Sequence, residues 1–208
     1  MKFKDNSSKE EANKHLKDML REVHYSYPAI TGRLPLAIDI GANLGAFSIT
    51  YRHNFTKIIA IEPNLDTLRA FNYTLTENGI DNVHLYNYAV GNTCGTTKLY
   101  RGGGEGISGN ASTTYGQGEY EEVPAIDFQG VMNLAGNNYI DYMKIDCEGA
   151  EYDFLQDQDL SNIYHIAGEY HACNKRKQER LWSHISHTHR LTLVKKWNIF
   201  TCRKKDKQ

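Results

Sequence analysis

Apolar residues along this chain form short runs that alternate with segments of helical spacing. Runs of about four to eight mostly apolar residues, bounded by glycine, proline or charged residues, are typical of buried strands. Such runs predict strands over residues 36–39, 57–62, 83–90, 141–146 and 163–171. Apolar positions three or four residues apart predict helices over residues 65–79 and 174–188. Strands that alternate with helices predict right-handed crossovers and a mainly parallel sheet.

The two ends of the chain depart from this alternation. Ser8 and Glu11 have the spacing of a capping box, and the apolar residues that follow share one face of an amphipathic helix. Residues 1–34 are therefore predicted to form this helix and a linker, and residues 35–208 to form the main domain. The apolar face is expected to pack on the domain, with a dimer contact as the less favoured alternative. Residues 190–202 predict an antiparallel hairpin.

Residues 101–118 contain seven glycines among small polar residues. Such a segment buries too little apolar surface to hold one conformation by itself. We expect a surface hairpin between residues 97–100 and 120–124, with a lid over a substrate as the slightly less favoured alternative.

Composition is consistent with one soluble α/β domain. Of the 208 residues, 40% are hydrophobic, and no apolar run approaches the roughly 20 residues needed to cross a bilayer. We expect neither a membrane span nor a signal peptide. The net charge of −1 gives no global indication of nucleic-acid binding. The four cysteines are scattered without a CxxC motif, which favours reduced thiols and a cytoplasmic location.

The turn after the first strand is the most informative local feature. Asp39 ends the strand, and Gly41 and Gly45 flank a tight turn into a helix. Glycines permit such a turn beside a ligand, and the start of the helix offers unpaired N–H groups. Dinucleotide-binding turns have the pattern GxGxxG, but Asn43 stands where their second glycine approaches a pyrophosphate. The pattern here is DxGxxxG, which provides poorly for a pyrophosphate.

Glu62 follows the second strand, where such folds hydrogen-bond the two hydroxyls of a ribose. Together with the glycine turn it predicts a nucleoside site. The alternatives are a turn without a ligand and a solvated carboxylate before Pro63.

Three carboxylates, Asp146, Glu148 and Glu151, cluster where the strand over residues 141–146 ends. Ligands of open α/β sheets bind at the carboxyl ends of the strands, beside the point where the strand order reverses. We therefore expect this cluster to face the same crevice as Asp39 and Glu62.

Three segments in this order, AspIleGlyAlaAsnLeuGly, AlaIleGluProAsn and LysIleAspCysGluGlyAlaGlu, resemble the FkbM family of S-adenosylmethionine-dependent methyltransferases. The resemblance covers residues 35–171, and its last segment is the most specific. It implies a class I methyltransferase fold of the Rossmann-like α/β type, with a mainly parallel seven-stranded sheet, helices on both faces and a C-terminal antiparallel hairpin. It also implies S-adenosylmethionine as cofactor and O-methylation of a hydroxyl on a sugar or secondary metabolite.

The resemblance also assigns roles to residues. The cofactor-binding residues expected from it and from the strand ends are Asp39, Gly41, Asn43, Gly45, Glu62, Asn64, Asn87, Ala89 and Asp146. Of these, Asn87 and Ala89 fall at the end of the third strand, where the adenine ring is expected. Asn87 is equally expected to bind the adenine ring or to face outward from the strand.

The catalytic candidates are Asp146, Glu148 and His171, because a hydroxyl acceptor must lose its proton as it is methylated. His171 is the preferred proton acceptor, since an ordinary imidazole pKa lies near neutrality. Glu169 points to the same side as His171. No metal is predicted, although Asp146, Glu169 and His171 are residue types that could gather magnesium or manganese.

Two other functions remain open at this point. A nicotinamide-dependent oxidoreductase shares the fold but would favour GxGxxG, which this turn lacks. A non-catalytic binding protein on a methyltransferase fold would retain Glu62 but lose the carboxylates near Asp146. The expected partner is a small-molecule or glycan hydroxyl acceptor, whose identity the sequence leaves open together with the oligomeric state.

Overall fold

In the computed structural model, residues 30–100, 112–114, 118–136 and 138–206 are described. The predicted N-terminal helix and most of the glycine-rich segment lie outside the described residues. The elements are β1 (Leu34–Ile40), α2 (Ala46–Tyr51), β2 (Phe55–Ile61), α3 (Leu65–Glu77), β3 (Val83–Tyr86), β4 (Ala89–Val90), β5 (Gly95–Tyr100), β6 (Tyr120–Ile126), α4 (Phe128–Leu134), β7 (Ile140–Ile145), α5 (Glu151–Leu155), β8 (Ile163–Glu169), α6 (Lys175–Thr188), β9 (His189–Val194), the 3-10 turn η1 (Lys195–Trp197) and β10 (Ile199–Lys204).

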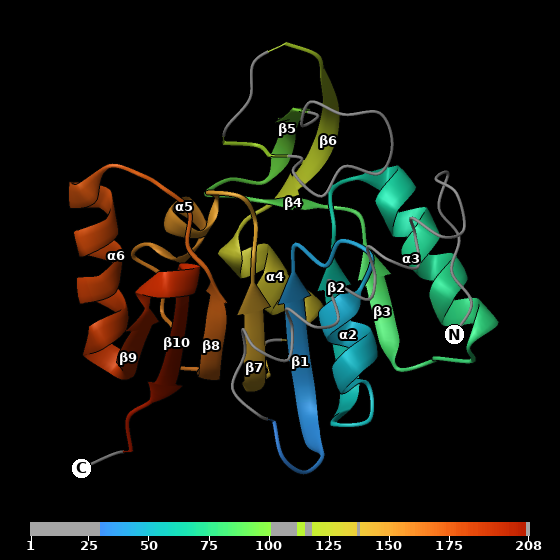
Figure 1. Ribbon diagram of the computed structural model, residues 1–208, viewed down its shortest axis with the longest axis horizontal. Helices are drawn as coiled ribbons and strands as arrows, with labels where there is room; N and C mark the ends of the chain where they lie inside the picture. Colours follow the sequence, from blue (N-terminus) through green and yellow to red (C-terminus); the bar gives the residue numbers. More distant parts are fainter. Residues whose placement is uncertain (1–29, 101–111, 115–117, 137, 207–208) are drawn as a thin grey trace.

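The larger of the two sheets has seven strands in the order β3-β2-β1-β7-β8-β10-β9. Neighbours from β3 to β8 are parallel, and β10 is antiparallel to both of its neighbours. The parallel strands therefore end at one edge of the sheet (Figure 1). The strand order reverses between β1 and β7, which is where open α/β sheets bind ligands. The mainly parallel sheet and the C-terminal hairpin predicted from the sequence are confirmed.

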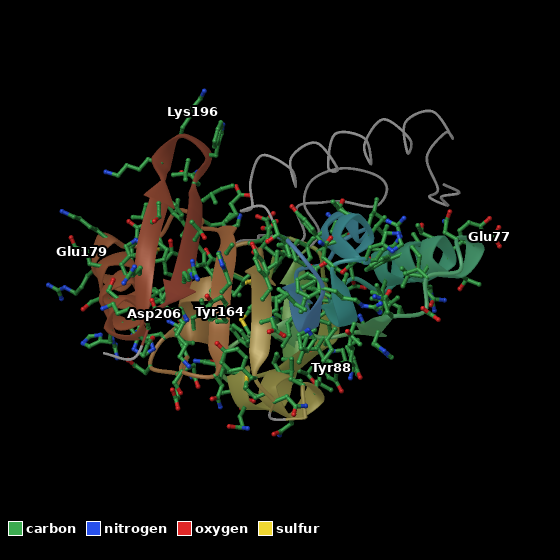
Figure 2. The ribbon with its side chains drawn as sticks, turned by 90° about the horizontal axis from the view of Figure 1, so that it is seen from below. Glu77, Tyr88, Tyr164, Glu179, Lys196 and Asp206 are labelled. Atoms are coloured by element: carbon green, nitrogen blue, oxygen red, sulfur yellow. The ribbon has the colours of Figure 1, made fainter. Side chains whose placement is uncertain are left out.

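Two hydrophobic cores cover the two faces of this sheet. Along β1, Ile38 and Ile40 face a core that includes side chains of α4, α5 and α6. Ala37 faces the other core, which contains side chains of α2 and α3. Figure 2 shows α2 and α3 on one side of the sheet and α4 on the other. Because both faces are covered, the central strands are apolar along most of their length. Among the described residues, no helix is long and apolar enough to span a membrane.

Side-chain caps set the starts of three helices. Asn64 Oδ1 accepts hydrogen bonds from the first free N–H groups of α3, and Asp127 and Asn174 cap α4 and α6 in the same way. Helix α3 ends at Glu77 and is followed by Gly79 with φ of 61°. Capping oxygens replace the missing intrahelical partners of these N–H groups, so the helices begin where the sequence offers Asn or Asp.

The smaller sheet has the order β4-β6-β5 and lies beyond the carboxyl ends of the parallel strands (Figure 1). Strands β5 and β6 form the predicted antiparallel hairpin. The single strand predicted over residues 83–90 is wrong in extent, because β3 ends at Tyr86 and residues 89–90 pair with β6 in the second sheet. Asn87 lies at this break, and its side-chain N–H groups donate to the backbone oxygens of Glu62 and Pro63.

Candidate active site

The turn after β1 packs directly against the end of β7. A Cβ on Gly41 would lie 1.7 Å from the backbone oxygen of Asp146, and one on Gly45 would lie 2.0 Å from the ring of Phe71. Both glycines also have positive φ, at 67° and 85°. The chain's own packing therefore requires glycine at both positions. Their contact with a cofactor stays a prediction, but the expected proximity of this turn to Asp146 is confirmed.

Glu62 joins the glycine turn to the start of α3. Its Oε2 accepts a hydrogen bond from the backbone N–H of Asn43 at 2.9 Å, and its Oε1 accepts one from that of Asn64 at 2.9 Å. The side chain is 7% exposed, and burial raises its pKa to about 7 in spite of these two bonds. Glu62 is thus not the solvated carboxylate of the alternative interpretation. Its contact with a ribose stays a prediction.

Three other predicted cofactor residues are already engaged by the chain. Asn64 Oδ1 caps α3, and the Asn87 amide donates to backbone oxygens at 3.0 and 2.7 Å, so Asn87 is not simply an outward-facing strand residue. Ala89 is 2% exposed and packs in the core of the smaller sheet. Asn43, by contrast, has φ of 49° and a buried Oδ1 that has no hydrogen-bond partner among the described residues.

Lys144 is a buried ammonium that sequence analysis did not identify. It stands opposite Asp39 in the register of β1 and β7, and its Nζ lies 3.2 Å from Asp39 Oδ1. Nζ also donates to the backbone oxygens of Ile40 at 3.2 Å and Gly41 at 2.6 Å. Burial lowers the pKa of Lys144, but the carboxylates of Asp39, Asp146 and Glu62 together outweigh burial and the net pKa is raised. Lys144 therefore stays charged and fixes the glycine turn.

Asp39 is buried beneath the glycine turn, where it contacts Lys144 and Ser48. It is fully buried, and its Oδ2 accepts a hydrogen bond from the Ser48 hydroxyl at 2.7 Å. Its direct contact with the cofactor stays a prediction. Within the chain, Asp39 orients Lys144 and the start of α2.

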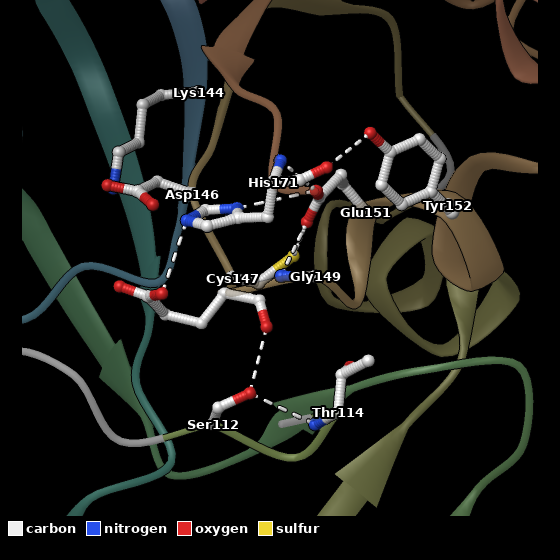
Figure 3. A network of polar contacts seen from close by, with 10 residues as sticks. Ser112, Thr114, Lys144, Asp146, Cys147, Gly149, Glu151, Tyr152 and His171 are labelled. Carbon is white, nitrogen blue, oxygen red and sulfur yellow. Dashed lines mark hydrogen bonds and ion pairs between the residues drawn. The ribbon is translucent and has the colours of Figure 1, made fainter. Parts of the chain in front are cut away.

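His171 is clamped between two carboxylates (Figure 3). Its Nε2 lies 3.2 Å from Glu148 Oε2, and its Nδ1 lies 3.3 Å from Glu151 Oε1. Burial lowers the pKa of His171, but the two carboxylates outweigh burial and raise it to about 10. The premise that His171 has a pKa near neutrality is therefore wrong. The ring carries a proton at neutral pH and cannot take another from an acceptor.

Glu151 organises this end of the site. Its side chain is fully buried and accepts hydrogen bonds from the backbone N–H groups of Gly149 at 2.9 Å and His171 at 2.8 Å. Burial raises its pKa, but the bonds from His171 outweigh burial and the net pKa is lowered. Glu151 is therefore an ionised anchor. Glu148, with φ of 51°, and Gly149, with φ of 98°, form the turn that brings the carboxylates together.

Asp146 lies between the glycine turn and this cluster. Its side chain is 33% exposed and its Oδ2 lies 4.0 Å from Lys144 Nζ. Burial raises its pKa, an effect that Lys144 partly offsets. The predicted convergence of Asp146, Glu148 and His171 at one edge of the sheet is confirmed. The catalytic roles of Asp146 and Glu148 stay predictions, whereas the protonated ring of His171 does not fit the role of proton acceptor.

Ser112 connects the second sheet to this cluster. Its hydroxyl donates to the backbone oxygen of Glu148 at 2.8 Å and accepts from the N–H of Thr114 at 3.0 Å (Figure 3). Ser112 also pairs with Tyr100 across the hairpin. The described part of the glycine-rich segment therefore lies against the turn that carries Glu148, and no sequence signal indicated this contact.

The strand order and the site at the carboxyl ends of β1, β2, β7 and β8 define a class I methyltransferase fold. A family model described as the methyltransferase FkbM domain matches residues 39–196. The chain belongs to the FkbM methyltransferase family. No curated protein matches this chain in sequence.

Two solved structures share the fold. An FkbM methyltransferase from Methylobacillus flagellatus KT is 14% identical with a TM-score of 0.57, and the match covers 92% of this chain and 52% of that one. TrmK from M. capricolum, in complex with S-adenosylhomocysteine, is 12% identical with a TM-score of 0.50, and the match covers 92% of this chain and 68% of that one. The present chain thus spans about half the length of the FkbM structure.

Proposed function

We propose that this chain is an S-adenosylmethionine-dependent O-methyltransferase that acts on a hydroxyl of a sugar or secondary metabolite. The observation that carries the proposal is the position of Asp146. It contacts the glycine turn on one side and belongs to the carboxylate cluster on the other. One residue thereby joins the proposed cofactor side of the crevice to the proposed acceptor side.

The residues on the cofactor side fit S-adenosylmethionine. When bound, this molecule supplies a methyl group on a cationic sulfonium. Glu62 binds the ribose through the lone pairs that Asn43 and Asn64 leave free, since each carboxylate oxygen accepts more than one hydrogen bond. The unmatched buried Oδ1 of Asn43 is an acceptor that a donor group of the cofactor would satisfy.

On the acceptor side, a carboxylate takes the proton that the hydroxyl loses. Glu148 is the preferred group, because its side chain is 31% exposed and is oriented by the protonated His171. Asp146 positions the acceptor beside the cofactor. His171 is a positioning residue in this scheme, and Glu151 holds it from the buried side.

The test is a turnover screen with the full chain, S-adenosylmethionine and a panel of sugars, glycosides and polyketide alcohols. The expected result is S-adenosylhomocysteine together with an acceptor heavier by one methylene group. Glu148→Gln is expected to lose about 10²- to 10⁴-fold in turnover, whereas Glu179→Gln, on the exposed face of α6, keeps the parental rate. Methylation of amines but not of alcohols would contradict O-methylation, and binding without turnover on any acceptor would favour the binding-protein alternative.

The oxidoreductase alternative is tested with the same sample. Thermal unfolding is followed with S-adenosylhomocysteine and, separately, with NAD⁺ and NADH. Stabilisation by S-adenosylhomocysteine alone supports the proposal, because a ligand that binds only the folded state raises its stability. Stabilisation by a nicotinamide dinucleotide alone would contradict it.

A further inference from the structure

Three side chains from two strand ends meet beside the carboxylate cluster. Asp146 follows β7, and Glu169 and His171 lie at the end of β8. Strands β7 and β8 are parallel neighbours with Ile145 opposite Gly168, so the residues after them share one edge. One ligand atom from each of the three side chains lies within 4.8 Å of the other two.

We propose that Asp146, Glu169 and His171 bind a divalent cation. Two carboxylate oxygens and one imidazole nitrogen form a donor set that Mn²⁺ accepts and that Mg²⁺ or Zn²⁺ can share. Ligand atoms around a six-coordinate ion of this size lie roughly 3 to 4 Å apart, given metal–oxygen distances of about 2.1 Å. Starting from separations of up to 4.8 Å, the ligand atoms therefore need to approach one another by at most about 2 Å to reach bonding distance.

The ring of His171 is already oriented for such a role. Its Nδ1 faces Glu151 at 3.3 Å, and Glu151 is fully buried and fixed by two backbone N–H groups. A carboxylate on the far nitrogen is the usual support of a metal-binding histidine. Nε2 is the coordinating atom, and the ion takes the place of the proton that this nitrogen shares with Glu148. Glu148, whose Oε2 lies 3.2 Å from Nε2, then stays beside the ion without coordinating it and remains the base for the acceptor proton.

Charge favours a cation at this place. Four carboxylates, those of Asp146, Glu148, Glu151 and Glu169, surround a single imidazole ring. Lys144 Nζ lies 4.0 Å from Asp146 but closer to Asp39. A divalent ion would balance the negative charge that Asp146, Glu148 and Glu151 bring to this ring.

The inference rests on the proposed function for its role in catalysis. The three ligands lie on the acceptor side, so the cation would hold the oxygen of the acceptor hydroxyl and lower its pKa. The released proton passes to Glu148, the methyl group forms a bond to the acceptor oxygen, and the sulfonium becomes the neutral thioether of S-adenosylhomocysteine. Substrates with a second oxygen next to the hydroxyl would chelate the ion and bind best.

The experiment titrates the chelator-treated full chain with MnCl₂ and follows free Mn²⁺ by electron paramagnetic resonance. One ion is expected to bind per chain, and Glu169→Gln is expected to weaken binding at least about tenfold. Asp146→Asn serves as the second ligand variant, and Glu179→Gln, a carboxylate exposed on α6, is the matched control with parental affinity. Circular dichroism checks that each variant is folded.

Absence of Mn²⁺ binding up to about 10⁻³ M would overturn the cation site, and so would equal binding by the parent and both folded ligand variants. MgCl₂ and ZnCl₂ are expected to displace Mn²⁺. Calorimetry with S-adenosylhomocysteine is run on the same samples. A chain that binds S-adenosylhomocysteine but not Mn²⁺ overturns the cation site and leaves the proposed function intact. A chain that binds Mn²⁺ but not S-adenosylhomocysteine supports the site and contradicts the proposed function.

Discussion

Replacing Lys144 with methionine tests how the glycine turn is held. The substitution keeps most of the side-chain volume but leaves the fully buried Asp39 carboxylate without its ammonium partner, which lies at 3.2 Å. The backbone oxygens of Ile40 and Gly41 lose their donor as well. Removing one partner of a buried ion pair destabilises a protein by about 3 to 5 kcal/mol, because an uncompensated charge remains inside. Lys144→Met is expected to lose an amount of this order in urea unfolding.

The matched control is Lys175→Met, which removes an ammonium that is 87% exposed and paired with Glu179. It is expected to change the free energy of unfolding by less than about 0.5 kcal/mol. Adding Asp39→Asn to Lys144→Met removes the unpaired charge, so the double variant is expected to be more stable than Lys144→Met alone. A Lys144→Met protein within about 0.5 kcal/mol of the parent would refute the reasoning.

Three further predictions concern other parts of the site. The pKa of Glu62 is raised to about 7, so the folded state binds a proton more tightly than the unfolded chain does. The contribution of this proton to the free energy of unfolding is therefore complete below about pH 4.5 and is lost as pH rises through 7. Between pH 4.5 and 8, the free energy of unfolding of Glu62→Gln relative to the parent should therefore rise by roughly 3 kcal/mol. Parallel pH profiles of the two proteins would contradict the raised pKa. Gly45→Ala places a Cβ 2.0 Å from Phe71 and should lose at least about 1 kcal/mol by chemical unfolding, whereas Gly91→Ala, which has open space, should not. Glu148→Gln should leave the affinity for S-adenosylhomocysteine within about twofold of the parent in calorimetry, because Glu148 acts on the acceptor; a larger loss would move it to the cofactor side.

The fold could be predicted because each of its signals is local. Apolar runs marked the strands, and the helix predicted over residues 65–79 is α3, which ends at Glu77. The break after Tyr86 was missed, since the run from Val83 to Val90 is apolar enough for one strand and only the pairing of residues 89–90 with β6 divides it.

The site was predicted less completely, because its roles depend on contacts between distant segments. Lys144 gains its role from standing opposite Asp39 across two strands, and its only sequence signal is a charge inside an apolar run. The pKa of His171 depends on Glu148 and Glu151, which the sequence placed nearby without showing that both would bond the same ring. The meeting of the site residues at the strand ends follows from the sheet topology. The protonation state of His171 depends on its distances to Glu148 and Glu151.

Calorimetric titration with S-adenosylhomocysteine, on the parent and on Glu62→Ala, tests the central claim most directly. The parent is expected to bind one molecule per chain. Glu62→Ala is expected to lose about 1.5 to 3 kcal/mol of binding, because charge-assisted hydrogen bonds to the ribose are removed together with the link between Asn43 and Asn64. Glu179→Ala, on the exposed face of α6, is expected to bind like the parent. A parent protein that does not bind S-adenosylhomocysteine, or a folded Glu62→Ala variant that binds it equally well, would contradict the account.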